Sequence, residues 1–65
     1  MKKIYTVSFK NQTGIETIDA IKIGTIPKDN RQICLFLEVD SYGDETGRIR
    51  TVDAVLIVSE KEKNS

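Results

Sequence analysis

The chain has 65 residues, and ten Lys and Arg residues balance ten Asp and Glu residues, so its formal net charge is zero. A chain of this length forms one small domain that buries only about 60% of its unfolded surface, so its core must be thin. There is no histidine and only one cysteine, which excludes a disulfide within the chain and argues against a metal or another cofactor. With a disulfide and a metal set aside, association with another chain is the remaining way to stabilise so small a domain.

Charge and hydropathy also indicate which class of partner and which cellular compartment to expect. Proteins that hold nucleic acid through its phosphates usually carry a basic excess, and this chain does not. No long apolar run follows Lys2 and Lys3, and no stretch approaches the roughly 18 apolar residues of a membrane helix. The lone cysteine and the absence of a leader pattern predict a cytoplasmic protein with no membrane partner.

The β-branched residues alternate with polar ones, which predicts an all-β fold of four to five antiparallel strands in a small sheet or barrel. The first strand is expected over residues 3–10, and a turn over residues 11–14 should place Gly14 at a positive φ. The second strand is expected over residues 15–23. Gly24 and the following proline-containing turn are expected to end it.

The third strand, expected over residues 31–40, has the most apolar sequence and should lie inside the sheet. Phe36 is assigned to the core, and Cys34 is interpreted as a small buried hydrophobe with little reactivity. The alternation divides the side chains between two faces, with Ile33, Leu35, Leu37 and Val39 on one and Cys34 and Phe36 on the other.

A loop over residues 41–47 leads to a fourth strand, expected over residues 48–59. Residues 1–59 then form the single β domain, and residues 60–65 form a frayed polar tail. The apolar residues of 51–61 also fit helical spacing, so the alternative is three strands plus a C-terminal helix. The many β-branched residues of this segment favour the strand.

Residues 17–23, TIDAIKI, resemble residues 51–57, TVDAVLI, and a Thr-Gly pair precedes each copy. The chain is therefore predicted to contain two similar hairpins in tandem. Asp19 and Asp53 should lie at a strand mouth or a bulge and accept backbone hydrogen bonds. The alternative is a pair of carboxylates that act together in acid–base chemistry or bind a cation, but the sequence indicates no cleft for them.

No group of residues indicates a reaction. The absence of histidine removes the usual general base and the Ser-His and Cys-His pairs. The four glycines are scattered and do not form a phosphate-binding loop. The sequence predicts a protein that is not an enzyme and uses no cofactor.

The acidic loop after the third strand is the densest charged feature. A tyrosine on such a loop can anchor an interface, and the arginines that follow should lie near acidic residues of the same hairpin. The alternatives are a solvated hairpin tip and a cation site, although the spacing does not fit an EF-hand. The predicted partner-binding residues are Asp40, Tyr42, Asp44, Glu45, Arg48 and Arg50.

These features predict a small non-catalytic protein-binding module, an inhibitor or accessory subunit that acts by contact on a larger protein or complex. Phages encode small neutral proteins of this kind against host machinery or defence. An unpaired sheet edge could also add a strand or form a homodimer. The alternative is a small barrel that binds single-stranded nucleic acid, for which the few aromatic residues give weak support.

Overall fold

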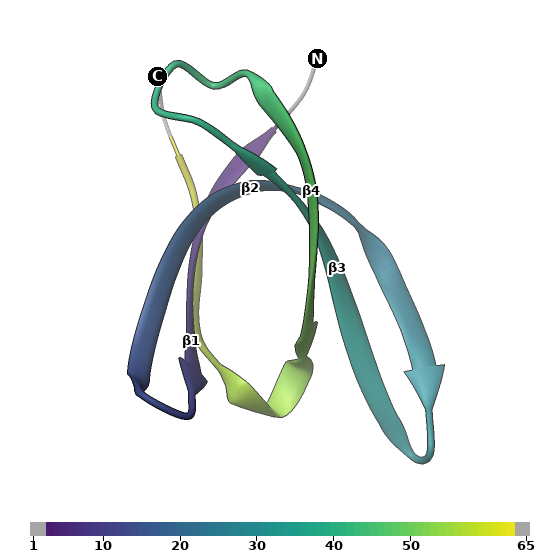
Figure 1. The fold of residues 1–65 in the computed structure, drawn as a ribbon. Helices are drawn as coiled ribbons and strands as arrows, with labels where there is room; N and C mark the ends of the chain where they lie inside the picture. Colours follow the sequence, from purple (N-terminus) through teal and green to yellow (C-terminus); the bar gives the residue numbers. More distant parts are fainter. Residues whose placement is uncertain (1–2, 64–65) are drawn as a thin grey trace.

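The computed structural model describes residues 3–63 and shows one five-stranded antiparallel sheet that is strongly curved (Figure 1). The strand order is β4-β3-β2-β1-β5. These findings confirm the predicted all-β fold. The elements are β1 (Ile4–Asn11), β2 (Gly14–Lys28), β3 (Arg31–Val39), β4 (Glu45–Asp53), the 3-10 turn η1 (Ala54–Leu56) and β5 (Ile57–Glu62).

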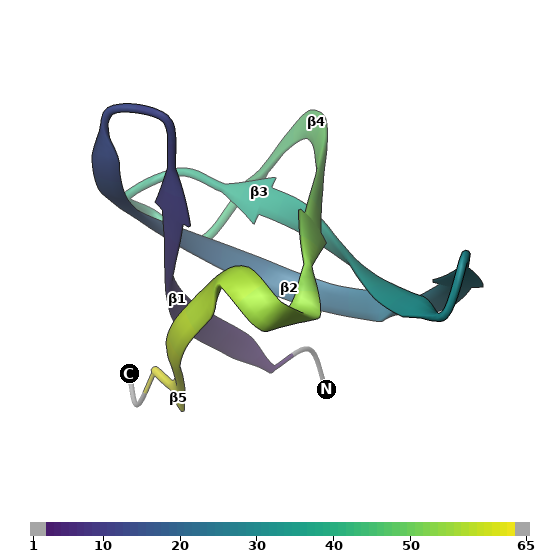
Figure 2. The same ribbon diagram turned by 90° about the horizontal axis from the view of Figure 1, so that it is seen from below.

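The sheet curves because its two edge strands follow one another along the chain. β4 lies at one end of the strand order, and β5 pairs with β1 at the other end. Only the three residues of η1 join them, and a 3-10 turn rises by about 2 Å per residue. The two edges must therefore converge at this end of the molecule, where Figure 2 shows η1 carrying the chain from β4 to β5.

The main core fills the inner side of the curved sheet. β3 lies between β2 and β4, as predicted for the most apolar strand. Phe36 is fully buried and Cys34 is a buried free thiol, which confirms the predicted burial of both. The buried cluster consists of Val7, Phe9, Ile18, Ala20, Cys34, Phe36 and Val52.

β2 continues through Gly24 and Pro27 to Lys28, so the predicted break in this strand is wrong. A shift of register just before Gly24 indicates a bulge in place of a turn. Pro27 is tolerated because β1 no longer flanks this half of β2, and a free edge needs no N–H donor. The turn follows at Asp29 and Asn30, whose φ values of 50° and 66° suit a two-residue hairpin. The first turn does match its prediction, with Gly14 at φ 135°.

The two similar heptapeptides adopt different conformations, although the hairpins β1–β2 and β3–β4 form as predicted. Residues 17–23 lie inside the continuous β2, whereas residues 51–57 end β4, form η1 and begin β5. The Asp53 carboxylate accepts a hydrogen bond from the backbone N–H of Val55 at 3.1 Å and so caps η1. Neither a single strand over residues 48–59 nor a helix over residues 51–61 is present.

Asp19 lies in the middle of β2, on its outer side, and holds the C-terminal strand in place. Its Oδ1 accepts a hydrogen bond from Thr6 Oγ1 at 2.8 Å, and its Oδ2 lies 2.8 Å from Lys63 Nζ. The backbone N–H of Lys63 also donates to a β1 carbonyl oxygen at 2.7 Å. β5 therefore continues to Glu62, into the segment expected to fray. Residues 64–65 of that segment lie outside the described residues.

Replacing Asp19 should show how much this contact stabilises the fold. The hydrogen bonds from Lys63 and Thr6 lower the pKa of Asp19. A carboxyl whose pKa is lower in the folded state stabilises the protein above about pH 4, and this stabilisation is lost as the pH falls through the folded value. Asp19→Asn should lower the free energy of unfolding by about 1 kcal/mol near neutral pH and by less in acid. Urea unfolding at both pH values measures this, and an equal loss at both would contradict it.

Candidate functional site

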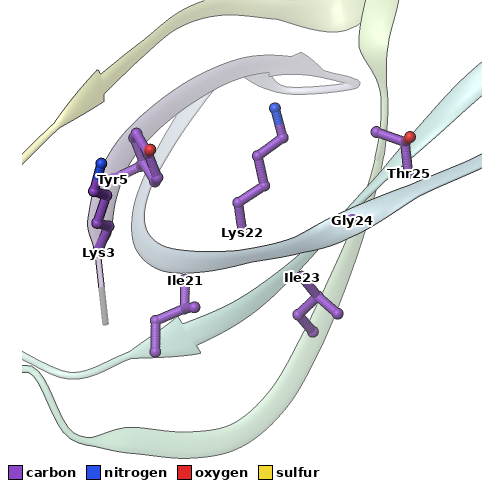
Figure 3. Close-up of a pocket in the computed structure, with 7 residues that line it drawn as sticks. All are labelled: Lys3, Tyr5, Ile21, Lys22, Ile23, Gly24 and Thr25. Atoms are coloured by element: carbon purple, nitrogen blue, oxygen red, sulfur yellow. The ribbon is translucent and has the colours of Figure 1, made fainter. Parts of the chain in front are cut away.

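The outer side of β3, with neighbouring parts of β2 and with Ile49 of β4, carries a cluster of aliphatic side chains. Residues that pair across an antiparallel sheet point to the same face. Ile21 lies opposite Leu37, which lies opposite Ile49, so three aliphatic side chains form a row across three strands. Figure 3 shows Ile21 and Ile23 pointing away from the inner side chain of Lys22. The outer apolar face is formed by Ile4, Ile21, Ile23, Ile26, Ile33, Leu35, Leu37 and Ile49.

Much of the outer apolar face is open to solvent. Ile23, Ile26 and Ile49 are 51%, 49% and 60% exposed, and the other members are half-buried by their neighbours. No helix or second sheet among residues 3–63 lies over them. Sheets that are apolar on both sides are normally covered on both. Residues 3–63 supply no layer that covers this face.

The predicted partner-binding loop lies at one end of the outer apolar face. Asp40 fixes its shape, because its Oδ1 accepts hydrogen bonds from the backbone N–H groups of Tyr42 at 2.8 Å and Asp44 at 3.0 Å. The backbone at Gly43 lies close to Ile4, since a Cβ there would be 3.4 Å from Ile4 Cδ1. Tyr42 is 89% exposed. The loop thus holds an exposed aromatic ring beside the outer apolar face.

The two predicted arginines interact with glutamates outside this loop. Arg50 Nη2 lies 2.8 Å from Glu16 Oε2, and Arg50 Nη1 lies 3.1 Å from Glu38 Oε1. The Arg50 guanidinium also lies over the Phe9 ring, 5.7 Å from its centroid. Arg48 approaches Glu38 only to 3.9 Å. The predicted pairing of arginines with acids of their own hairpin is therefore confirmed for Glu38.

The six predicted residues thus divide into two groups. Asp40, Tyr42, Asp44 and Glu45 lie together in the loop and at the start of β4, beside the outer apolar face. Arg48 and Arg50 follow along β4. No ion pair joins either arginine to Asp40 or Asp44 within the described part of the chain. The structure therefore brings four of the six residues together.

Arg50 closes one end of the core. The hydrogen bond with Arg50 lowers the pKa of Glu16, and the same bond raises the pKa of Arg50, so both groups remain charged across the neutral range. This contact joins β4 to β2 across the inner side of the sheet, above Phe9. The sequence did not indicate it, because Glu16 lies on a distant hairpin and only the curvature of the sheet brings it near.

An open pocket of about 650 Å³ lies beside the bulge of β2 (Figure 3). Lys22 points to the inner side there, and its Nζ lies 3.2 Å from Glu60 Oε2. Lys3, Tyr5 and Thr25 contribute an ammonium group and two hydroxyl groups. No three side chains among residues 3–63 are grouped to hold a metal ion. The pocket is a mixed polar and apolar depression with no arrangement specific to one ligand.

No protein-family model matches this chain, and comparisons with curated proteins and with solved structures find no match either. Among residues 3–63, no helix has the length and hydropathy needed to cross a bilayer. What the protein does must be inferred from its own surface. The outer apolar face, with Tyr42 of the neighbouring loop, is a feature that the described fold leaves exposed.

Arg50→Ala should destabilise the protein, whereas Arg48→Ala should not. The Arg50 side chain is 23% exposed and makes two short charge-assisted contacts, so its loss should cost about 1–2 kcal/mol of unfolding free energy. The Arg48 side chain is 67% exposed and makes one long contact, which should contribute less than about 0.5 kcal/mol. Chemical denaturation measures both variants, and equal losses would contradict the role given to Arg50.

Proposed function

We propose that this protein is a small non-catalytic protein-binding module that contacts another polypeptide chain through the outer apolar face. The proposal rests on β3, whose side chains are apolar on both faces of the sheet. Cys34 and Phe36 fill the core on one side, while Ile33, Leu35 and Leu37 line the other side, where the described chain adds no second layer. Burying apolar surface contributes about 25 cal/mol per Å², so an uncovered cluster of this size favours association.

The loop beside this face supports the same proposal. Protein interfaces have an apolar centre with a polar rim, and tyrosine is enriched among the residues that dominate binding. Tyr42 and Asp44 flank Gly43, whose backbone lies close to Ile4 of the face, so they lie near its rim. Because Asp40 already fixes the turn, binding would cost little further ordering of the loop.

The role that fits is that of an inhibitor or accessory subunit in the cytoplasm, of the kind that phages encode against host machinery or defence. Covering a surface of a larger protein blocks or recruits that protein without any reaction. The small size, the zero net charge and the exposed apolar surface support this role.

Binding of single-stranded nucleic acid, the alternative, has less support. Proteins of that kind stack bases on exposed aromatic rings along a basic groove. Phe9 and Phe36 are buried here, and Tyr5 packs against the core, so only Tyr42 offers an open ring. The outer face presents aliphatic side chains, which do not stack with bases.

Two isoleucines with equal exposure allow a matched test. Ile49 is 60% exposed on the outer apolar face, and Ile15 is 63% exposed at the β1–β2 hairpin, six residues before Ile21 and at the far end of β2 from the cluster. Ile49→Lys should reduce capture of a partner protein from nuclease-treated lysate of the native host at least about tenfold. Ile15→Lys should leave capture unchanged. Quantitative mass spectrometry measures the captured protein, and circular dichroism checks that both variants fold.

A bound protein that survives nuclease treatment and is lost only with Ile49→Lys supports the proposal. Equal capture by the two variants would contradict the role of the outer apolar face. Recovery of nucleic acid alone, lost on nuclease treatment, would favour the alternative function.

A further inference from the structure

The two ends of the outer apolar face differ in charge. Lys28 and Arg31 pair across β2 and β3, two positions beyond the Ile26–Ile33 pair, so they share its outer side. Arg31 Nη1 lies 3.3 Å from Asp53 Oδ2. The remaining acid of this end, Asp29, lies in the turn. Lys28 has no ion-pair partner among residues 3–63, so its ammonium group is available on the outer side of this strand pair, with Asp29 beside it in the turn.

The opposite end of the face is acidic. β3 has nine residues, so its ends lie roughly 27 Å apart at about 3.4 Å per residue. The three carboxylates of Asp40, Asp44 and Glu45 follow its C-terminal end. Asp40 uses its carboxylate within the turn, whereas Asp44 contributes only backbone groups to it. The outer apolar face therefore has the Lys28 ammonium group at one end and the Asp44 carboxylate at the other.

We infer that the chain covering the outer apolar face is a second copy of this protein, bound face to face with the two β3 strands antiparallel. This inference rests on the proposed function and names the partner of the same surface. The two-fold axis of this dimer lies in the plane of the interface, perpendicular to β3 and near Leu35. It places the acidic loop of each copy against the Lys28 end of the other. A parallel arrangement would instead bring the acidic loops of both copies together, which is unfavourable.

The size and charge of the protein suit such a dimer. A stable interface buries about 800 Å² on each partner, which is roughly one sixth of the 4840 Å² surface of this chain. The zero net charge means that two copies do not repel each other at long range. Among residues 3–63 the main core has seven buried side chains, so a second apolar layer between two copies would add stability that one small chain lacks.

The strand edges are less suited to self-association than the outer apolar face. Symmetric antiparallel pairing of two β5 strands about Glu60 or Lys61 places like charges opposite each other. Pairing of two β4 strands about their midpoint places Arg48 opposite Arg50. The free half of β2 contains Pro27, which has no N–H to donate. These features favour the face over an edge as the site of a homodimer.

A charge exchange tests both the dimer and its orientation. Lys28→Glu and Asp44→Lys should each weaken the homodimer at least about tenfold, because each creates two repulsive contacts. An equimolar mixture of the two variants should form a heterodimer with the affinity of the original protein, since both contacts become attractive. Sedimentation equilibrium at low salt measures the dissociation constants. Lys10→Glu, an exposed change outside the face, is the control and should leave the dimer intact.

The outcomes separate this inference from the proposed function. A protein that stays monomeric at all concentrations, while Ile49→Lys still abolishes capture of another protein, overturns the dimer and leaves the binding function standing. A dimer that survives Ile49→Lys overturns the use of the outer apolar face. A dimer that is lost with Ile49→Lys but keeps its affinity in both charge variants overturns the antiparallel arrangement. Recovery of dimerisation only in the mixture is the result expected.

Discussion

The structure depends on one constraint: β3 is apolar on both sides, and the sheet that contains it has a single layer. Curving the sheet encloses Phe36 and the inner face of β3. The outer face is not enclosed in the same way, and residues 3–63 contain no element that forms a second layer over it. The burial of one face by curvature therefore leaves the other face for association with another chain.

Several polar contacts hold the curved sheet together. Asp53 caps η1 and so turns the chain from β4 into β5. Arg50 joins β4 to β2 through Glu16 above the core, and Asp19 holds the end of β5 through Lys63. Each contact joins segments that are not neighbours in the sheet or marks a change of direction. Together they stabilise a core that is too small to be stabilised by apolar burial alone.

Local pattern was enough to predict the first and third strands and the two faces of β3, because side chains alternate with a period of two in any sheet. It could not predict that β2 continues through Pro27, since this depends on where β1 stops flanking it. Nor could it distinguish Asp19 from Asp53, which have similar neighbours in sequence but different partners in space. The acidic loop was predicted as a site. The outer apolar face was not, because the curvature decides which apolar side of β3 is enclosed.

If another chain covers the outer apolar face in solution, the isoleucine methyl groups of that face are shielded from solvent. Their solvent access is therefore the most direct test. Methyl NMR spectra of the protein in solution, recorded with a soluble paramagnetic agent, report that access for each Cδ1 group. We predict that Ile49 and Ile26 are protected, while Ile15, which is equally exposed in the single chain, is broadened by the agent. If Ile49 and Ile15 broaden to the same extent, both alone and with any captured partner, the outer face is not covered and its assignment as the binding surface is wrong.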